Sequence, residues 1–325
     1  MKSNTKTLTE GPLAKQILLV SLPLALSNLL QVLFNMSDVA VVGRFAGSTA
    51  LGAVGSTSIF VTLFTGFLIG LSNGINVLVA RFYGARHPND VHKTVHSALI
   101  VSIIAGVVLL LVGLLGSPAL LRLLNTKEDL LPGAILYLRV YFLGMPALAL
   151  FNFGNAIFSA IGETKKPLVY LSTAGVLNIL LNLFFVIVCQ LNVVGVALAS
   201  AISQCVSAAL ILHALTKVED CYALDFKAVQ LDPAMTKSIL ALGLPAGFSA
   251  AVAMVAVFCG AANTLVPSLL LAYELFGGAG LELIALGCGL SYMLSGYHGL
   301  YSSQTFLSDK FHSEYTARWE ARLHH

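Results

Sequence analysis

Seven stretches of this sequence contain no Lys, Arg, Asp or Glu, and together they make up most of the chain. They are 16–37, 45–80, 94–121, 140–162, 167–216, 238–273 and 283–308. A helix that crosses a bilayer needs about 20 mainly apolar residues, and most of these stretches hold one such helix. Soluble domains have about 25% charged residues, whereas this chain has 10%. We therefore expect an all-α membrane protein, folded as a polytopic helical bundle.

The stretch 167–216 is long enough for two spans, so we expect a break near Gln190 to Asn192. Six spans are then predicted before residue 217, at 16–42, 54–80, 94–116, 134–158, 167–189 and 194–215. A seventh begins near Ser238. The basic residues before the first apolar run resemble the flank of a signal peptide, but the run is long and leads into further spans. We interpret it as an uncleaved first helix.

The loops between the predicted spans carry unequal numbers of basic residues. Eleven lie on the side of the N-terminus: Lys2, Lys6, Lys15, Arg81, Arg86, Lys93, Lys165, Lys166, Lys217, Lys227 and Lys237. Four lie on the other side: Arg44, Arg122, Lys127 and Arg139. Because basic loops stay in the cytoplasm, we expect a multi-pass protein of the inner or plasma membrane, in contact with lipid, with a cytoplasmic N-terminus. The net charge of +3 reflects this asymmetry and predicts no nucleic-acid partner.

The sequence lacks the residue patterns that an enzyme needs. It contains no nucleophile–base set, no metal triad and no phosphate-binding loop. Its five cysteines form no CxxC pair or zinc spacing. His92 and His96 lie four residues apart, but no third metal ligand is near them in the sequence. We therefore expect no catalytic residues, no metal and no cofactor.

One motif occurs twice at a constant offset. The first copy is Lys15-x-Ile17-Leu18-x-x-x-Leu22-Pro23-x-x-x-Ser27, and the second is Lys237-x-Ile239-Leu240-x-x-x-Leu244-Pro245-x-x-x-Ser249. The six spans between the copies return the chain to the same side of the membrane. The second copy therefore starts a unit with the same orientation as the first, which predicts parallel repeats about an axis along the membrane normal.

Asp38 is the one acidic residue inside the first span. Inserting a charged side chain costs about 2.5–3.5 kcal/mol, so such a residue indicates function by default. Helix rise places Asp38, Asn182 and Ser200 about 7–10 Å inside the outer ends of their spans. Asn178 lies one turn from Asn182 on the same helix face. These oxygen-rich side chains suit Na⁺ or proton exchange at Asp38, and hydrogen bonding between helices is the alternative.

Other small and polar residues are open to simpler interpretations. Five amides on the first and fourth spans either line a cavity or bond to one another: Asn28, Gln31, Asn35, Asn152 and Asn155. Gly66, Gly70 and Gly74 form a stripe of small residues on the second span. Close helix packing is the most direct interpretation of that stripe.

The first 250 residues resemble a known transporter family. The matching segments are 21–23 (SLP), 38–44 (DVAVVGR), 160–167 (AIGETKKP), 177–182 (LNILLN) and 195–200 (GVALAS). Their order and spacing over six spans are similar to the amino-terminal lobe of MATE transporters, the multidrug and toxic compound extrusion family. The resemblance implies a secondary active transporter that exports small organic cations in exchange for Na⁺ or H⁺.

The resemblance also implies a cation site in this lobe. The family uses an aspartate in span one, an asparagine with an acid four residues on in span five, and a threonine in span six. Asp38, Asn178 and Ser200 match or nearly match that pattern. Asn182 replaces the acid, which removes one negative charge. We expect weaker Na⁺ binding as a result, and the coupling ion stays open between Na⁺ and H⁺.

The last part of the chain resembles a different family. The segments 262–267 (ANTLVP), 273–277 (YELFG) and 299–304 (GLYSSQ) are similar to the last membrane helices of CLC chloride channels and exchangers. Tyr301 corresponds to that family's tyrosine whose hydroxyl faces chloride. The glycine-rich anion motifs of the family are missing here, so we expect no anion transport.

Together these features predict a composite chain. It consists of a six-span lobe (1–216), a cytoplasmic inter-lobe loop (217–237), the start of a second lobe (238–250) and a CLC-like fragment (251–325). We expect a transporter that is incomplete as a single chain, for which a homodimer offers a second lobe. The alternatives are a non-transporting fragment or assembly subunit, a flippase of lipid-linked sugars, and an anion channel.

The charge asymmetry of the loops predicts which positions are open to the outside. Cysteines introduced singly at Arg86 and Lys165 should resist an impermeant thiol reagent added to intact cells, while a cysteine at Lys127 should react. Reaction of the Lys165→Cys variant from outside would contradict the predicted orientation.

Overall fold

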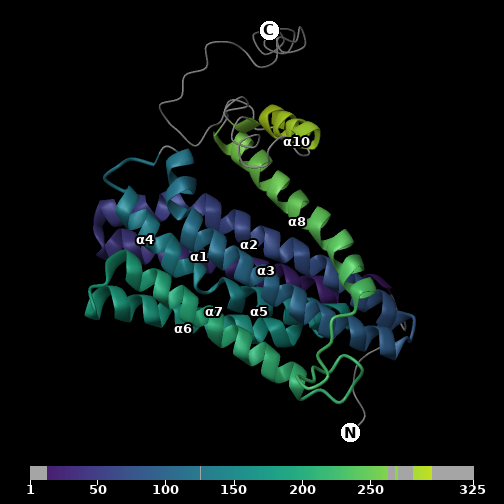
Figure 1. The fold of residues 1–325 in the computed structure, drawn as a ribbon. Coiled ribbons are helices and arrows are strands. Elements are labelled where there is room, and N and C mark those ends of the chain that lie inside the picture. Colours follow the sequence, from purple (N-terminus) through teal and green to yellow (C-terminus); the bar gives the residue numbers. More distant parts are fainter. Residues whose placement is uncertain (1–12, 125, 263–267, 270–280, 295–325) are drawn as a thin grey trace, which may run out of the picture. The chain divides into compact units, whose positions relative to one another are not determined.

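The computed structural model describes residues 13–124, 126–262, 268–269 and 281–294. Its helices, in chain order, are α1 (Leu13–Phe45), α2 (Gly47–Gly84), α3 (Pro88–Leu123), α4 (Leu131–Phe142), α5 (Met145–Ala160), α6 (Lys165–Leu183), η1 (Phe184–Val188), α7 (Asn192–Thr216), α8 (Pro233–Ala262) and α10 (Leu281–Leu294) (Figure 1). The predicted all-helical architecture is confirmed over these residues.

Several of these helices are suited to a bilayer. Within the described part of the chain, four helices are long and apolar enough to cross a membrane: Ser48–Gly84, Pro88–Leu123, Lys165–Val188 and Asn192–Thr216. The bent pair α4 and α5 makes a fifth if it counts as one span. The 33-residue α1 contains the predicted first span.

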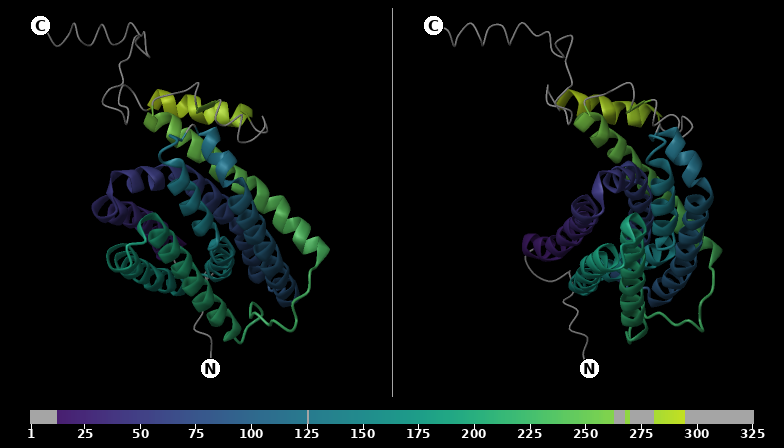
Figure 2. Two further views of the ribbon diagram at one scale, coloured as in Figure 1. Left: turned by 60° about the vertical axis from the view of Figure 1, so that its left-hand side comes forward. Right: turned by 90° about the vertical axis from the view of Figure 1, so that its left-hand side faces the viewer.

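The predicted break within 167–216 is confirmed. Helix α6 continues into the π-helical turn η1, where Cys189 N–H donates to Phe184 O at 3.1 Å. Gln190 and Asn192 then adopt positive φ angles of 52° and 47°, a conformation that asparagine tolerates better than most residues. The chain reverses over these residues, and α7 returns beside α6 (Figure 2).

The span predicted at 134–158 is divided by a bend. Helices α4 and α5 meet at an angle of 45°. The sequence Gly144-Met145-Pro146 explains the bend, because Pro146 has no N–H to donate to Phe142 and disfavours helical geometry at the residue before it. A side chain at Gly144 would also collide with Gln204 and Ala201 of α7.

Helix α5 lies inside the bundle, where it packs against α2, α3 and α7. The largest apolar core gathers there and includes Ile75 of α2, Val95 of α3, Phe153 of α5 and Ile211 of α7, all of them buried. On the outer side of the bundle, α3 exposes mainly apolar residues such as Leu115, whose exposed fraction is 79%. Such a surface is suited to lipid.

The segment 217–232 is fixed to the ends of the helices. Tyr222 is buried against Tyr83 and Phe158. The buried His96 contacts the backbone of Asp225 through Nε2, which gives this histidine a structural role. The segment is shorter than the predicted loop 217–237, because Asp232 accepts hydrogen bonds from the first N–H groups of α8 and starts that helix at Pro233.

The chain divides into two compact units, Met1–Phe248 and Ser249–His325. Helix α8 runs through this division. It therefore holds both the predicted start of a second lobe (238–250) and the first residues of the segment predicted to be CLC-like. The described remainder of the second unit includes α10.

Helix α2 and the first half of α8 approach each other through glycines. A Cβ atom on Gly70 would collide with Gly247, and one on Gly74 would lie 2.5 Å from the backbone nitrogen of Gly243. The predicted role of Gly70 and Gly74 in close helix packing is therefore confirmed. This contact leaves no room for a side chain on α2 at either position.

The glycine contact predicts unequal effects of two alanine substitutions in α2. Gly70→Ala should destabilise the protein by about 1–3 kcal/mol, because the new methyl group overpacks against backbone that has no flexible side chain to move. Gly55→Ala is the matched control, since its Cβ would meet nothing within 4 Å. Thermal unfolding in detergent should show a lower Tm only for Gly70→Ala, and equal Tm values would show that the two helices do not depend on this contact.

Candidate functional site

A cluster of polar side chains forms where α1, α6 and α7 meet. Asp38 of α1 lies at its centre, and only 4% of its surface is exposed. Asn182 Nδ2 of α6 donates to Asp38 Oδ1 at 2.5 Å. Ser200 Oγ of α7 donates to Asp38 Oδ2 at 2.7 Å. Each carboxylate oxygen is therefore held by a different helix.

Asn178 completes this cluster. Its Nδ2 donates to Ser200 Oγ at 3.2 Å, and its Oδ1 accepts from Asn182 Nδ2 at 3.1 Å. The four side chains thus form a closed ring of hydrogen bonds, and all four are buried. The structure brings together Asp38, Asn178, Asn182 and Ser200, the four residues that the sequence predicted as a cation site.

The local fold explains why α6 and α7 can both reach Asp38. Asn178 and Asn182 are one helical turn apart and face the same side of α6. The π-helical turn follows directly after Leu183, and π turns inside helices are frequent at functional sites. The reversal at 189–192 then brings Ser200 of α7 level with the two asparagines.

The cluster has a negative charge without a positive partner. The ion pairs of the described residues are His87–Asp90, Lys93–Asp232 and Lys166–Glu163, and Asp38 is in none of them. A buried carboxylate that lacks a counter-charge is costly even when neutral groups donate hydrogen bonds to it. In addition, Asn182 Oδ1 is buried and accepts no hydrogen bond from any described residue.

This donor set fits a hard monovalent cation. Asp38 supplies two carboxylate oxygens, and Asn178, Asn182 and Ser200 supply one oxygen each. Oxygen ligands suit hard cations, whereas the described residues contain no group of three His, Cys, Asp or Glu side chains that would hold a transition metal. A proton on Asp38 would remove the uncompensated charge equally well.

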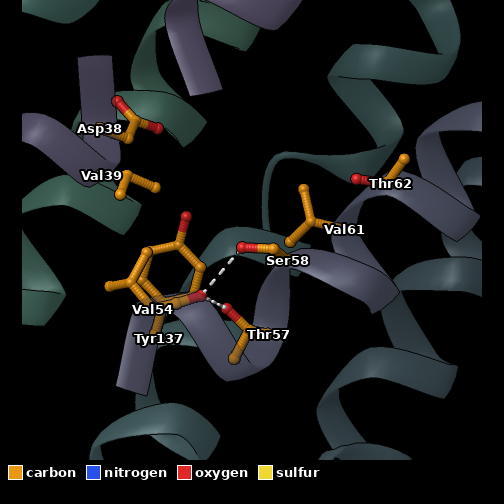
Figure 3. A pocket seen from close by; sticks show the side chains of 8 residues that line it. All are labelled: Asp38, Val39, Val54, Thr57, Ser58, Val61, Thr62 and Tyr137. Carbon is orange, nitrogen blue, oxygen red and sulfur yellow. Dashed lines mark hydrogen bonds between the residues drawn. The ribbon is translucent and has the colours of Figure 1, made fainter. Parts of the chain in front are cut away.

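A pocket lies on the other side of Asp38, between α1, α2 and α4 (Figure 3). Its polar wall comes from Asp38, from Thr57, Ser58 and Thr62 of α2, and from Tyr137 of α4. The hydroxyl of Tyr137 points toward Asp38 in this view. Asp38 therefore separates the ring of hydrogen bonds from a small hollow that is lined by hydroxyl groups.

A second group of polar side chains lies one turn from Ser200 and Tyr137, towards the α4–α5 bend. The side chain of Tyr141 lies near those of Thr65 and Gln204. Two buried oxygens in this group, Thr65 Oγ1 and Gln204 Oε1, have no well-formed hydrogen bond within the described part of the chain. This region is polar enough to hold water, which makes two to four hydrogen bonds in buried sites.

Among the amides predicted to line a cavity, the three whose side chains are described do not line this pocket. Asn152 Nδ2 donates to Leu148 O of its own helix, and Asn155 accepts from Ser159. Gln31 is half-buried and does not line the pocket. The side chains of Asn28 and Asn35, and all of Tyr301, lie outside the described residues. The predicted CLC resemblance of 251–325 thus stays a prediction.

The hydroxyl-bearing wall of the pocket was not predicted from the sequence. Its signal was the spacing of Ser58 and Thr62, which places two hydroxyl groups four residues apart on one face of α2 inside an apolar span, with Thr57 next to Ser58. Tyr137 gave no signal of its own, because a tyrosine near the end of a membrane helix is common at the interface with water.

Comparison with known proteins identifies a family match over the segment that contains most of this cluster. Residues 23–184 match the MatE family model, and this match contains Asp38, Asn178 and Asn182. This part of the chain belongs to the MATE family. MATE proteins are transporters rather than enzymes, and the chain is accordingly a multi-pass membrane protein.

Two curated MATE relatives come from bacteria. The probable multidrug resistance protein YpnP of Bacillus subtilis is 31% identical over 245 residues, which are 74% of this chain and 53% of YpnP. The multidrug export protein MepA of Staphylococcus aureus is 26% identical over 241 residues, which are 73% of this chain and 52% of MepA. The chain spans about half the length of the curated relatives it matches.

The fold agrees with a solved MATE structure. A crystal structure of MATE in the bent conformation superimposes with a TM-score of 0.75 at 25% identity, covering 91% of this chain and 68% of that chain. The predicted membrane bundle with a MATE-like lobe is confirmed by this likeness.

Proposed function

We propose that this chain is the cation-coupling part of a MATE exporter of small organic cations, driven by Na⁺ or H⁺. Asp38, Asn178, Asn182 and Ser200 form the coupling site. The proposal assigns export because the curated relatives carry the names multidrug resistance protein and multidrug export protein. It needs no cofactor other than the coupling ion.

The uncompensated charge of Asp38 is the observation that carries this proposal. A buried carboxylate with neutral neighbours favours whichever species removes its charge. A bound cation or proton would therefore stabilise the packing of α1 against α6 and α7, and its release would weaken that packing. An ion that stabilises one arrangement of helices shifts the protein toward that arrangement. This is the physical requirement for coupling.

The identity of Asn182 restricts the ion to a single positive charge. With one carboxylate in the cluster, one monovalent cation makes the site neutral. The acid that other members of the family carry at this position would leave one negative charge after Na⁺ bound. We infer that the site of this chain binds Na⁺ more weakly and is suited to proton coupling.

We further propose a cytoplasmic N-terminus, on the basis of the basic loops. Two copies inserted in the same orientation would present two such lobes to each other, because parallel repeats share one orientation. A homodimer is thus one way to form the cleft between lobes in which MATE substrates are expected to bind. Interhelical hydrogen bonding without ion binding is the competing role of the cluster.

Asp38→Asn should abolish ion-driven efflux in a protein that carries both lobes, because the amide keeps the shape of the side chain but cannot take up a charge-compensating ion. Efflux of a fluorescent organic cation from pump-deficient cells measures this effect. Asp90→Asn is the matched control, since Asp90 lies outside the cluster beside His87. Unchanged efflux in Asp38→Asn, with membrane insertion confirmed for both variants, would reduce the cluster to a structural role.

Asn182→Asp should strengthen Na⁺ binding, because it restores a second carboxylate beside Asp38. Equilibrium binding of radioactive sodium to the purified chain in detergent should rise by about tenfold or more, which corresponds to about 1.4 kcal/mol. Asn152→Asp places an acid on a neighbouring helix outside the cluster and serves as the control. Equal sodium binding in Asn182→Asp and the native chain would contradict a cation site at these residues.

A further inference from the structure

Helix α2 exposes a row of small and polar residues. Gly55, Ser58 and Thr62 are all exposed, at the spacing that places residues on one face of a helix. Ser58 lies about 6 Å inside the predicted start of this span at residue 54, by helix rise. Asp38 lies about 7 Å before Gly43, near the predicted end of the first span, by the same measure. The row and the carboxylate are thus at similar depth.

This row is unlike the face that α3 presents at its surface. There the exposed residues include Ile104, Val108 and Leu115, as lipid requires. Hydroxyl groups have no partners among lipid tails, so polar residues within a span generally face protein or a water-filled space. The Gly55, Ser58 and Thr62 face is thus better suited to contact with water or protein than to lipid.

The pocket beside Asp38 begins at this face. Ser58 and Thr62 are exposed, whereas Thr57 and Tyr137, which also line the pocket, are buried. The pocket therefore leads from the surface of α2 inward to Asp38 (Figure 3). About 50 Å³ of it is open to the centres of water molecules. About 10–15 Å³ of such space holds one water, so the pocket has room for a few.

Two hydroxyl groups of this wall donate their protons to the backbone of their own helix. Thr57 Oγ1 donates its proton to Val54 O at 2.7 Å, and Ser58 Oγ donates to the same carbonyl at 3.3 Å. Their protons are thus committed to the helix, and their lone pairs remain available. A hydroxyl group provides two acceptor lone pairs in addition to its single proton.

On the opposite side of Asp38, the described residues enclose the carboxylate more tightly. Asn182 is fully buried and Ser200 is 6% exposed, and both are bonded to the carboxylate. An ion approaching from α6 and α7 would have to break the ring of hydrogen bonds. The pocket side requires no such rearrangement.

We propose that the pocket between α1, α2 and α4 is a hydrated antechamber through which a monovalent cation or a hydrated proton reaches Asp38. Thr57 and Ser58 act as transient oxygen ligands on this path, and Tyr137 borders its inner end. The identity of the ion rests on the proposed function, whereas the hydration of the pocket does not. An experiment can therefore distinguish failure of the proposed function from failure of the antechamber.

Cysteine accessibility tests the antechamber in the full chain, without requiring transport. In a background where the native cysteines are replaced by alanine, Thr57→Cys should react with the small cationic reagent MTSEA in membrane vesicles. Ser72→Cys is the matched control, because Ser72 is a buried serine of the same helix that does not line the pocket. We expect reaction at position 57 at least tenfold faster than at position 72.

Occupancy of Asp38 should protect the introduced thiol. Saturating Na⁺ should slow the reaction of Thr57→Cys several-fold, and so should acid pH after the rate is corrected for the smaller fraction of cysteine thiolate. Adding Asp38→Asn should remove that protection. Equal rates at positions 57 and 72 would overturn the antechamber. A fast reaction that neither Na⁺ nor acid slows would overturn the ion path.

A second variant covers the case in which Thr57→Cys does not insert. Val61→Cys lies in the same pocket and is also buried, so it should show the same reactivity and protection. Failure of the proposed function alone would appear differently. Efflux would then persist in Asp38→Asn while the thiols at positions 57 and 61 remained reactive.

Discussion

The structure depends on one buried carboxylate that has no positive partner. Asp38 sits inside an apolar bundle, and its two oxygens bind α6 through Asn182 and α7 through Ser200. Neutral donors reduce the cost of burying the charge but do not remove it. The packing of α1 against these helices is therefore sensitive to any proton or cation that binds at Asp38. Under the proposed function, ion binding at Asp38 would therefore change how these helices pack.

Backbone irregularities position the groups around this carboxylate. The reversal after the π-helical turn brings Ser200 opposite Asn178. The bend at Gly144 changes the direction of the chain by 45° between α4 and α5. The glycine contact of Gly70 with Gly247 fixes α2 against α8 on another part of the surface. The irregular positions thus bring side chains of α6 and α7 to Asp38, while the pocket on its other side is lined by regular segments of α1, α2 and α4.

The sequence predicted the parts of this arrangement that follow from periodicity and depth. The charge-free stretches indicated the spans, and helix rise placed Asp38, Asn182 and Ser200 at one level, where the structure joins them. It did not predict the bend at Gly144, because a proline inside an apolar run is compatible with one kinked span as well as with two helices. It also missed Tyr137, since the position of an aromatic ring depends on packing between α2 and α4 that one sequence does not encode locally.

The protonation state of Asp38 tests the cation-site hypothesis most directly. Infrared difference spectroscopy of the purified chain can compare the carboxyl band before and after a pH step or the addition of Na⁺, with Asp38→Asn as the reference. If Asp38 exchanges its charge-compensating ion, a protonated carboxyl band should change with pH or Na⁺ and be missing from Asp38→Asn. A difference spectrum identical in the native chain and in Asp38→Asn would contradict the assignment of Asp38 as the coupling carboxylate.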